Sequence, residues 1–354
     1  MGYKEIKVGA VTVGGAFPIS VQSMCSVPFS RFKELVFQAK ELEEMGCDIL
    51  RVSVPDKESA ELFGKLKKEL KIPLVADIHF DHRLALAAID AGADKIRINP
   101  GNIGSENIKT VVKKAKEHGI PIRVGVNSGS LEKVVLEKYG APVPEALAES
   151  AKKNVEILEK LDFGDIIVSI KSSDVVSTIK SYRIFDSINS GRYPLHVGVT
   201  EAGTLKSGLI KNSVGIGALL LEGIGSTIRY SLSAPPNEEI TAAKTLLRAL
   251  GLRQEGVEII ACPTCGRTTI DVTELADELE NKLTGVKKRF KVAVMGCVVN
   301  GPGEAAEADI GVTGAAGKYV VFKKENGKTI VVLKDADRKT ATDFIINAAK
   351  ENER

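Results

Sequence analysis

The sequence predicts an α/β protein in which an amino-terminal (β/α)8 TIM barrel is followed by a small α+β domain. Eight short aliphatic segments recur between residues 19 and 232 of the 354-residue chain, with apolar residues at helical spacing between them. Eight strand–helix units over roughly 230 residues are the usual size of this barrel. The segments are almost continuously apolar, as parallel strands buried on both faces are. Hydrophobic residues make up 44% of the chain and Trp is absent, so the core is expected to be aliphatic.

The barrel elements follow one another without a gap. The predicted strands lie at residues 19–24, 48–54, 72–78, 95–100, 120–127, 165–171, 194–200 and 226–232. The segments between them are helical in pattern, as in FKELVFQAKELEEMG at residues 32–46. Before the first strand, IKVGAVTVGGAF at residues 6–17 predicts a hairpin that closes the bottom of the barrel.

The pattern changes at SLSAPPNEEI, where two prolines predict a linker or the start of the last barrel helix. We therefore expect a barrel over residues 1–235 and a second domain over residues 236–354. The second domain has strands at residues 257–261 and 290–296 with a helix at 271–283 between them. A hairpin with an Asn-Gly turn at 318–333 and a final helix follow.

Charge and hydropathy exclude several classes of protein. The net charge of +3 is mild and the basic residues alternate with acidic ones, so we expect no nucleic-acid partner. The amino terminus has no apolar signal segment, and the most apolar stretch, residues 214–225, is too short for a bilayer and contains Glu222. We expect a cytoplasmic protein without a membrane partner.

Polar residues end every predicted barrel strand, and active sites of such barrels lie at the carboxyl ends of the strands. Four of these residues are cations that would converge on one mouth: Arg51, Arg97, Arg123 and Lys171. Converging cations repel one another unless an anion is bound, and arginine suits the oxygens of phosphate. The alternative is that they form salt bridges at the rim or packing layers inside the barrel. The further candidates at strand ends are His79, Asn127, Thr200, Glu201, Ser226 and Arg229.

Three cysteines follow the two strands of the second domain, in ACPTCGR (Cys262 and Cys265) and MGCVVNGPGE (Cys297). Such a set fits an iron–sulfur site or structural zinc better than a redox pair, which needs no third cysteine. A fourth ligand must come from elsewhere, and the nearest candidate is Glu304. Its carboxylate is a harder and more labile iron ligand than thiolate, which would leave one metal position exchangeable. Cys47 fits a core position, whereas Cys25, close to the end of the first barrel strand, stays an open alternative.

Several long motifs together resemble one known family. They are ACPTCGR, MGCVVNGPGE, ADIHFDHRLA, IRINPGNIG, RVGVNSGS and HVGVTEAG. They are similar to the bacterial 4-hydroxy-3-methylbut-2-enyl diphosphate synthases in their compact two-domain form, over essentially the whole chain. The resemblance implies a barrel joined to a [4Fe–4S] domain whose cluster ligands are Cys262, Cys265, Cys297 and Glu304.

The resemblance also implies an activity of the methylerythritol phosphate route to isoprenoids. Such enzymes reductively open 2-C-methyl-D-erythritol 2,4-cyclodiphosphate and expel a hydroxyl as water, with single electrons from ferredoxin or flavodoxin. The diphosphate would be bound by Arg51, Arg97, Arg123 and Lys171, with Ser226, Arg229 and His79 as further candidates. Asn127, Thr200 and Glu201 would lie beside the reacting carbons, with Glu201 as proton donor and Glu304 releasing its iron. Members of the family form homodimers.

Two other classes remain as alternatives from the residues alone. The first is a barrel enzyme resembling dihydropteroate synthase with a structural zinc domain attached. The second is a non-catalytic protein that holds an anion in its basic barrel mouth and uses its cysteines as a redox sensor. Metal analysis tests the first alternative, and an assay of turnover tests the second.

Overall fold

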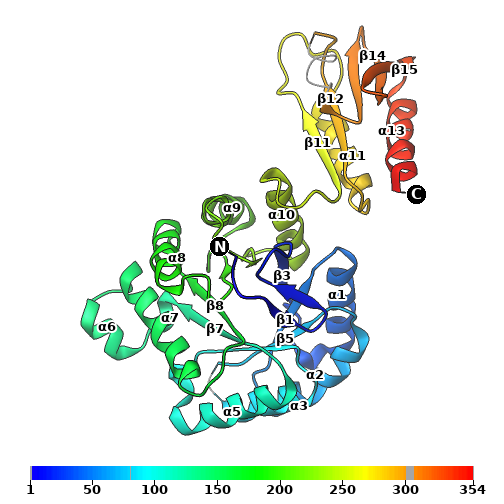
Figure 1. Cartoon of the computed structure of the whole chain (residues 1–354). Coiled ribbons are helices and arrows are strands. Elements are labelled where there is room, and N and C mark those ends of the chain that lie inside the picture. Colours follow the sequence, from blue (N-terminus) through cyan, green and yellow to red (C-terminus); the bar gives the residue numbers. More distant parts are fainter. Residues whose placement is uncertain (1, 80, 300–306, 354) are drawn as a thin grey trace. The chain divides into compact units, whose positions relative to one another are not determined.

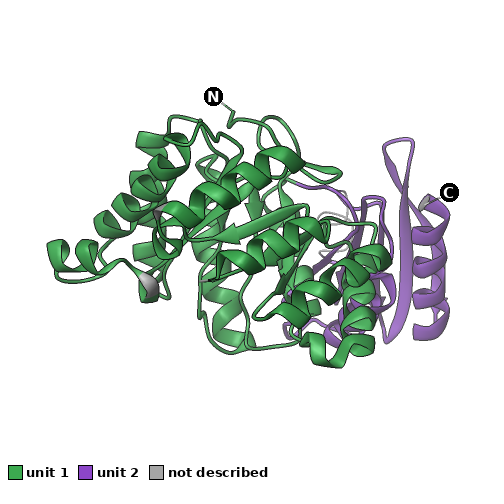
Figure 2. Ribbon diagram, turned by 90° about the horizontal axis from the view of Figure 1, so that it is seen from below, with its two compact units in different colours: residues 1–252 green, residues 253–354 purple. Residues whose placement is uncertain are grey.

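The chain consists of two compact units, Met1–Leu252 and Arg253–Arg354, which are coloured separately in Figure 2. The computed structural model describes residues 2–79, 81–299 and 307–353. The division comes after the helix at residues 236–249, whereas the sequence predicts a boundary at residue 235. Pro235 is the N-cap of that helix and Pro236 is its first residue, the position that favours proline, so the two prolines start the helix.

The first unit contains a closed barrel of eight parallel strands (Figure 1). The strands are β3 (Ser20–Met24), β4 (Ile49–Ser53), β5 (Leu74–Asp77), β6 (Lys95–Ile98), β7 (Ile122–Asn127), β8 (Ile166–Lys171), β9 (His196–Val197) and β10 (Thr227–Ile228). Their order in the sheet is β8-β7-β6-β5-β4-β3-β10-β9, and a parallel bridge from Val168 to Leu195 joins its two ends. The eight predicted barrel strands are confirmed, although the last two are much shorter than predicted.

Helices connect the strands and form the outer ring of the barrel. They are α1 (Phe32–Glu44), α2 (Lys57–Glu69), α3 (His82–Asp90), α4 (Pro100–Ile103), α5 (Ser105–His118), α6 (Lys133–Tyr139), α7 (Pro144–Glu159), α8 (Val175–Asn189), α9 (Leu205–Leu221) and α10 (Pro236–Ala249). Asp56, Asp81 and Asp174 begin α2, α3 and α8 as N-caps, each accepting a backbone N–H of the first turn. No helix in the described ranges is long and apolar enough to cross a membrane.

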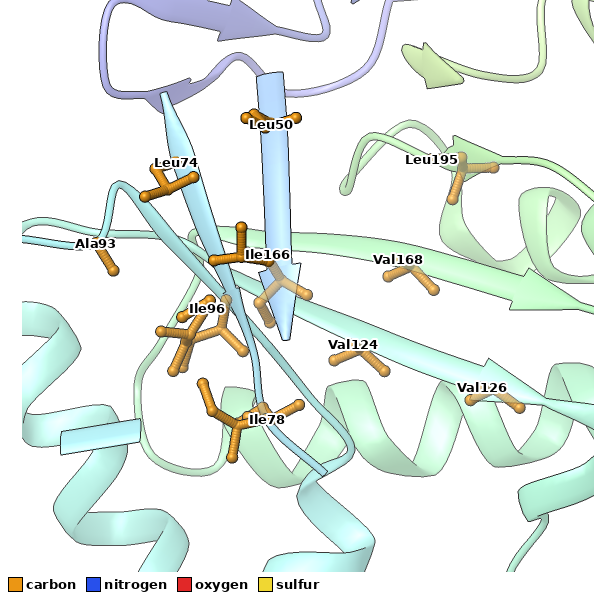
Figure 3. Packing of buried hydrophobic residues seen from close by; sticks show 14 of the residues in the cluster. Leu50, Leu74, Ile78, Ala93, Ile96, Val124, Val126, Ile166, Val168 and Leu195 are labelled. Carbon is orange, nitrogen blue, oxygen red and sulfur yellow. The ribbon is translucent and has the colours of Figure 1, made fainter. Parts of the chain in front are cut away.

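The barrel strands are packed through aliphatic side chains, as the composition predicted. Figure 3 shows Leu50, Leu74, Ile96, Val124 and Val168 from five different strands; each of them is fully buried. At the amino-terminal end of the barrel, the hairpin of β1 (Ile6–Val8) and β2 (Val11–Val13) packs on the first residues of several strands. The predicted hairpin at the bottom of the barrel is thus confirmed.

The second unit is a five-stranded mixed sheet with the order β11-β12-β13-β14-β15. Its elements are β11 (Val257–Ala261), α11 (Val272–Leu283), β12 (Phe290–Met295), β13 (Ile310–Ala315), β14 (Lys318–Glu325), β15 (Lys328–Ala336) and α13 (Arg338–Glu353). The first three strands are parallel and the last two antiparallel. The predicted Asn-Gly turn is present, with positive φ at both Asn326 and Gly327, as a type I′ hairpin requires.

Candidate active site

Two adjoining pockets open at the carboxyl end of the barrel strands. One, of about 100 Å³, is lined by Arg51, Asp77, His79, Arg97, Arg123, Asn127, Ser169, Lys171, Thr200, Arg229 and Ser231. The other, of about 230 Å³, is lined by His79, Arg97, Asn99, Asn102, Gly125, Asn127, Ser128, Gly129, Thr200 and Glu201. Four residues line both pockets, so the two form one site. All of the predicted barrel residues except Ser226 meet here.

The smaller pocket is strongly cationic. Five of its lining residues are Arg or Lys, and only one, Asp77, is acidic. Arg97 and Arg123 lie opposite each other on the adjacent strands β6 and β7, so their side chains leave the sheet on the same side. Arg97, Arg123 and Lys171 are at most 7% exposed, so solvent screens their repulsion little. The predicted convergence of cations on one mouth is therefore present.

The guanidinium of Arg123 has two buried N–H groups without a hydrogen-bond acceptor in the described residues. Its Nε and Nη1 are buried and make no hydrogen bond within the described part of the chain, and the Nε of Arg97 is in the same state. Arg97 otherwise donates through Nη1 to Asp77 Oδ1 at 3.4 Å and through Nη2 to the carbonyl of Gly125 at 3.4 Å. Buried charged donors without partners are strongly unfavourable, so a bound anion with several oxygens would complete this arrangement.

The electrostatics of the mouth lead to the same conclusion. Burial, and then the charges of Arg51 and Arg97, hold the pKa of Arg123 well below its ordinary value. Burial and the neighbouring guanidiniums likewise lower the pKa of Lys171, and they lower that of Arg51 to about 10. Asp77 shows the opposite balance, because burial raises its pKa but the surrounding guanidiniums lower it overall. A polyanionic ligand would relieve the repulsion among the cations.

The contact between His79 and Arg97 indicates which nitrogen of the His79 ring accepts a hydrogen bond. Its Nε2 lies 3.0 Å from Nη1 of Arg97. A guanidinium only donates, so Nε2 is the acceptor, and the neutral ring carries its proton on Nδ1. In this arrangement His79 supports Arg97, and its ring lines both pockets.

Glu201 lines the larger of the two pockets, and Asn127 lines both of them. Glu201 is exposed, lines the larger pocket and has a φ of 49°, which is unusual for a residue other than glycine. Such backbone strain is often found at functional sites. When the oxygen and nitrogen of its side-chain amide exchange places, Asn127 forms two hydrogen bonds. Its Oδ1 accepts from Nη2 of Arg97 at 3.3 Å, and its Nδ2 donates to the carbonyl of Val126 at 3.1 Å.

Ser226 is predicted to bind the substrate at the barrel mouth, but it lines neither pocket. It precedes β10, and its carbonyl accepts the N–H of Ser20, the first residue of β3, so it lies at the amino-terminal end of the barrel. Because β10 ends at Ile228, the mouth residues of this segment are Arg229 and Ser231. Ser231 is two residues beyond Arg229, the spacing that places extended residues on one side, and this signal was available in the sequence.

The absence of a side chain at Gly125 makes room for Arg97. A Cβ built at Gly125 would lie 2.4 Å from Nε of Arg97. We therefore expect Gly125→Ala to displace this guanidinium and raise the KM for an anionic substrate by roughly ten-fold, the effect of one charge-assisted hydrogen bond. Steady-state kinetics measure this effect. Gly285→Ala is the matched control, since a Cβ there meets nothing within 4 Å and Gly285 lines neither of the two pockets. An unchanged KM for Gly125→Ala would mean that Arg97 does not bind the substrate.

The cysteines of the second unit lie where two adjacent strands end. β11 and β12 are parallel and in register from Val257 with Phe290 to Ala261 with Val294, so the turns after them meet at one edge. The N–H of Gly296 donates to Sγ of Cys262 at 3.1 Å. Thr269 donates to the carbonyl of Gly296 through its N–H at 2.9 Å and its hydroxyl at 3.3 Å. The two cysteine turns are therefore joined by hydrogen bonds.

The donor set of this edge suits a thiolate-bound cluster. Cys262 and Cys297 are half-buried and Cys265 is exposed, and a backbone amide already faces one sulfur, as it would face a thiolate ligand. Within residues 2–79, 81–299 and 307–353, no three Cys, His, Asp or Glu side chains are close enough together to hold a metal ion. The predicted fourth ligand, Glu304, lies outside the described residues.

The two remaining cysteines are thiols of the barrel. Cys25 and Cys47 are buried, and burial raises the pKa of each to about 12. Cys47 also contacts the carbonyl of Ile49 at 3.1 Å. The predicted core role of Cys47 is confirmed. Burial leaves Cys25 protonated at neutral pH, which makes it a poor candidate for the missing ligand.

Fold and site together define a class of protein: a (β/α)8-barrel enzyme with a cationic mouth for an anionic substrate, joined to a cysteine-bearing α+β unit. Comparison with known proteins agrees with this description. The family model of the GcpE TIM-barrel domain matches residues 3–244, and that of the GcpE protein C-terminal domain matches residues 258–351. The chain belongs to the GcpE family, the family of the 4-hydroxy-3-methylbut-2-en-1-yl diphosphate synthases, and is an enzyme of the oxidoreductase type.

Curated relatives support the assignment over nearly the full length. A protein of Caldanaerobacter subterraneus subsp. tengcongensis is 57% identical over 94% of this chain and 93% of its own length. One from Clostridium tetani is 56% identical over 94% of this chain and 95% of its own length. Both are named 4-hydroxy-3-methylbut-2-en-1-yl diphosphate synthase (flavodoxin).

Among solved structures, the barrel is similar to that of dihydropteroate synthase. The enzyme from Stenotrophomonas maltophilia superposes with a TM-score of 0.51 over 69% of this chain and 97% of its own, at 12% identity. At that identity the likeness shows the barrel fold alone. It does not support the alternative activity.

Proposed function

We propose that this chain reductively opens 2-C-methyl-D-erythritol 2,4-cyclodiphosphate to 4-hydroxy-3-methylbut-2-enyl diphosphate, in the methylerythritol phosphate route to isoprenoids. The observation that carries this proposal is the buried guanidinium of Arg123 among the other cations of the barrel mouth, because two of its donors, Nε and Nη1, have no hydrogen-bond partner in the described residues. A cyclic diphosphate supplies a compact group of anionic oxygens for this pocket. The membership in the GcpE family selects this diphosphate among the possible anions.

The barrel residues would bind and orient the substrate. Arg51, Arg97, Arg123, Lys171 and Arg229 would hold the diphosphate, and their burial would strengthen each contact. The larger pocket, with Asn127, Thr200 and Glu201, would then hold the carbon skeleton. Exposed Glu201 is the candidate proton donor for the hydroxyl that leaves as water.

The cysteine edge would hold the redox cofactor. Cys262, Cys265, Cys297 and Glu304 are the proposed ligands of a [4Fe–4S] cluster, with Glu304 as the labile one. When bound, the cluster supplies two electrons one at a time and a Lewis-acidic iron. The names of the relatives support flavodoxin as the electron donor, with ferredoxin as the alternative. We further propose that the chain acts as a homodimer.

Metal analysis and turnover test this proposal. Protein purified without oxygen is expected to contain about four irons and four sulfides per chain and to show the visible absorption of an iron–sulfur protein. With reduced flavodoxin it is expected to convert the cyclodiphosphate to the linear diphosphate. One zinc per chain without sulfide, or a loaded cluster without turnover under any reductant, would contradict the proposal.

A further inference from the structure

Glu239 is a buried carboxylate of α10 that faces the barrel mouth. It is 4% exposed and lies in the first turn of the helix, where the helix dipole favours negative charge. Its Oε2 accepts the hydroxyl of Ser23 on β3 at 2.9 Å, and its Oε1 accepts the N–H of Leu232 at 3.3 Å. With these two contacts the carboxylate is fixed to the last residues of a strand and to the loop after β10.

The same carboxylate also binds Arg229 in a bidentate pair. Nε of Arg229 donates to Oε2 and Nη2 donates to Oε1, both at 3.2 Å. Nη1 makes no hydrogen bond to the residues that the structure describes, and the side chain is 17% exposed and lines the smaller pocket. Because one edge of the planar guanidinium is taken by Glu239, the edge formed by Nη1 and Nη2 remains for a ligand.

The loop that follows Arg229 is fixed by the same contacts. Leu232 is next to Ser231, which lines the pocket, and Ser233 donates its N–H to the carbonyl of Gly203 at 3.0 Å. Without Glu239, both Arg229 and the backbone around Ser231 would lose a partner on the side away from the pocket. A flexible arginine loses more side-chain entropy when it binds a ligand, and its affinity falls accordingly.

We propose that Glu239 is a positioning residue of the anion site, which holds Arg229 and the segment with Ser231 in place for the phosphate groups of the ligand. Glu239 does not touch the ligand and acts through Arg229. The inference rests on the proposed function only for the identity of the anion, since any diphosphate would engage the same guanidinium edge.

Binding of inorganic pyrophosphate tests the inference independently of turnover. In titration calorimetry of the anaerobically purified protein, we expect Glu239→Gln to bind pyrophosphate about ten-fold more weakly than wild type, the effect of one charge-assisted contact. Glutamine keeps the shape but cannot accept two bonds from Arg229. The matched control is Glu159→Gln, a helix carboxylate that accepts from Arg192 and Tyr193, at 2.9 and 2.7 Å, away from the mouth. This variant is expected to bind like wild type.

Kinetics and a double-mutant cycle separate positioning from a general loss of structure. Glu239→Gln is expected to raise the KM for the cyclodiphosphate with kcat and iron content nearly unchanged. Arg229→Lys, which retains the charge but not the planar fork, is expected to show the same loss of affinity. In an Arg229→Ala protein, Glu239→Gln is expected to add nothing further.

Two results would overturn the inference: wild-type affinity for pyrophosphate in Glu239→Gln or Arg229→Lys, or additive losses in the double variant. If Glu239→Gln fails to fold, Arg229→Lys keeps the inference falsifiable, because wild-type affinity for pyrophosphate in that variant would overturn it. Pyrophosphate binding by the wild type without turnover of the cyclodiphosphate would refute the proposed function and leave the role of Glu239 intact.

Discussion

An Arg123→Met protein is expected to be more stable than the wild type and to have lost most of its affinity for the substrate. Arg123 is 2% exposed, with two of its donors unpartnered in the described residues. Replacing a buried, uncompensated charge with an apolar side chain of similar volume is typically stabilising, here by about 1–4 kcal/mol. The variant would also lose two charge-assisted hydrogen bonds to the substrate, each worth about 1.5–3 kcal/mol. We therefore expect kcat/KM to fall by roughly a hundred-fold or more.

Urea unfolding of the ligand-free protein and steady-state kinetics measure the two effects. The matched control is Arg183→Met, because Arg183 is an arginine half-exposed on α8 and paired with Glu222. It is expected to change neither quantity by much, since exposed ion pairs contribute little. A less stable Arg123→Met protein with normal kcat/KM would show that Arg123 is a structural cation and not part of the substrate site.

The second large effect is expected at the cysteine edge. Cys297→Ser is expected to lose both the cluster and the turnover, because a serine hydroxyl is a much poorer iron ligand than thiolate. Glu304→Ala is expected to retain part of the iron and to lose most of the turnover, because a labile carboxylate holds the cluster less strongly than the cysteines do. Iron and sulfide analysis, the visible spectrum and the assay with reduced flavodoxin measure these outcomes.

Cys47→Ala is the control for this pair of variants. Cys47 is buried in the barrel and contacts the carbonyl of Ile49, so its removal should leave the iron content unchanged. Full iron content in Cys297→Ser would contradict the proposed ligand set. Normal activity in Glu304→Ala would contradict only the carboxylate ligand, and would reopen the search for the fourth position.

Sequence periodicity predicted the barrel because its signal is local. Near-continuous apolar segments such as 165–171 are typical of buried parallel strands, and all eight are present. The prediction was least accurate where the strands are shortest. β9 and β10 contain only two residues each, so the residues at the mouth, Thr200, Glu201, Arg229 and Ser231, follow the strands in loops. Ser226 begins its apolar segment, so it lies at the amino-terminal end of the barrel and not at the predicted mouth.

Contacts between distant parts of the chain could not be predicted in this way. Ser23 and Glu239 are hydrogen-bonded across 216 positions, and no local pattern identifies Glu239 as a residue of the site. Lys95 is a similar case: it begins β6, is fully buried and donates to Oε1 of Gln22 at 3.2 Å. Only the closed barrel brings such polar side chains together in its interior. The three cysteines of the second unit, in contrast, are marked as candidate metal ligands by their spacing in the sequence. The full ligand set with Glu304 is what the family resemblance implies, and it remains a proposal.

The mutual repulsion at the barrel mouth has a consequence for how long the protein survives in a cell. Any ligand that binds only the folded state adds a stabilising free energy of RT ln(1 + [L]/Kd), about 2.7 kcal/mol at a hundred-fold excess over Kd. Here the proposed anionic ligand would also neutralise buried cations that otherwise oppose folding. If the supply of that ligand fell, the empty enzyme would be expected to unfold more often and to become more accessible to proteases. The abundance of the enzyme would then follow the supply of its substrate without a separate regulator.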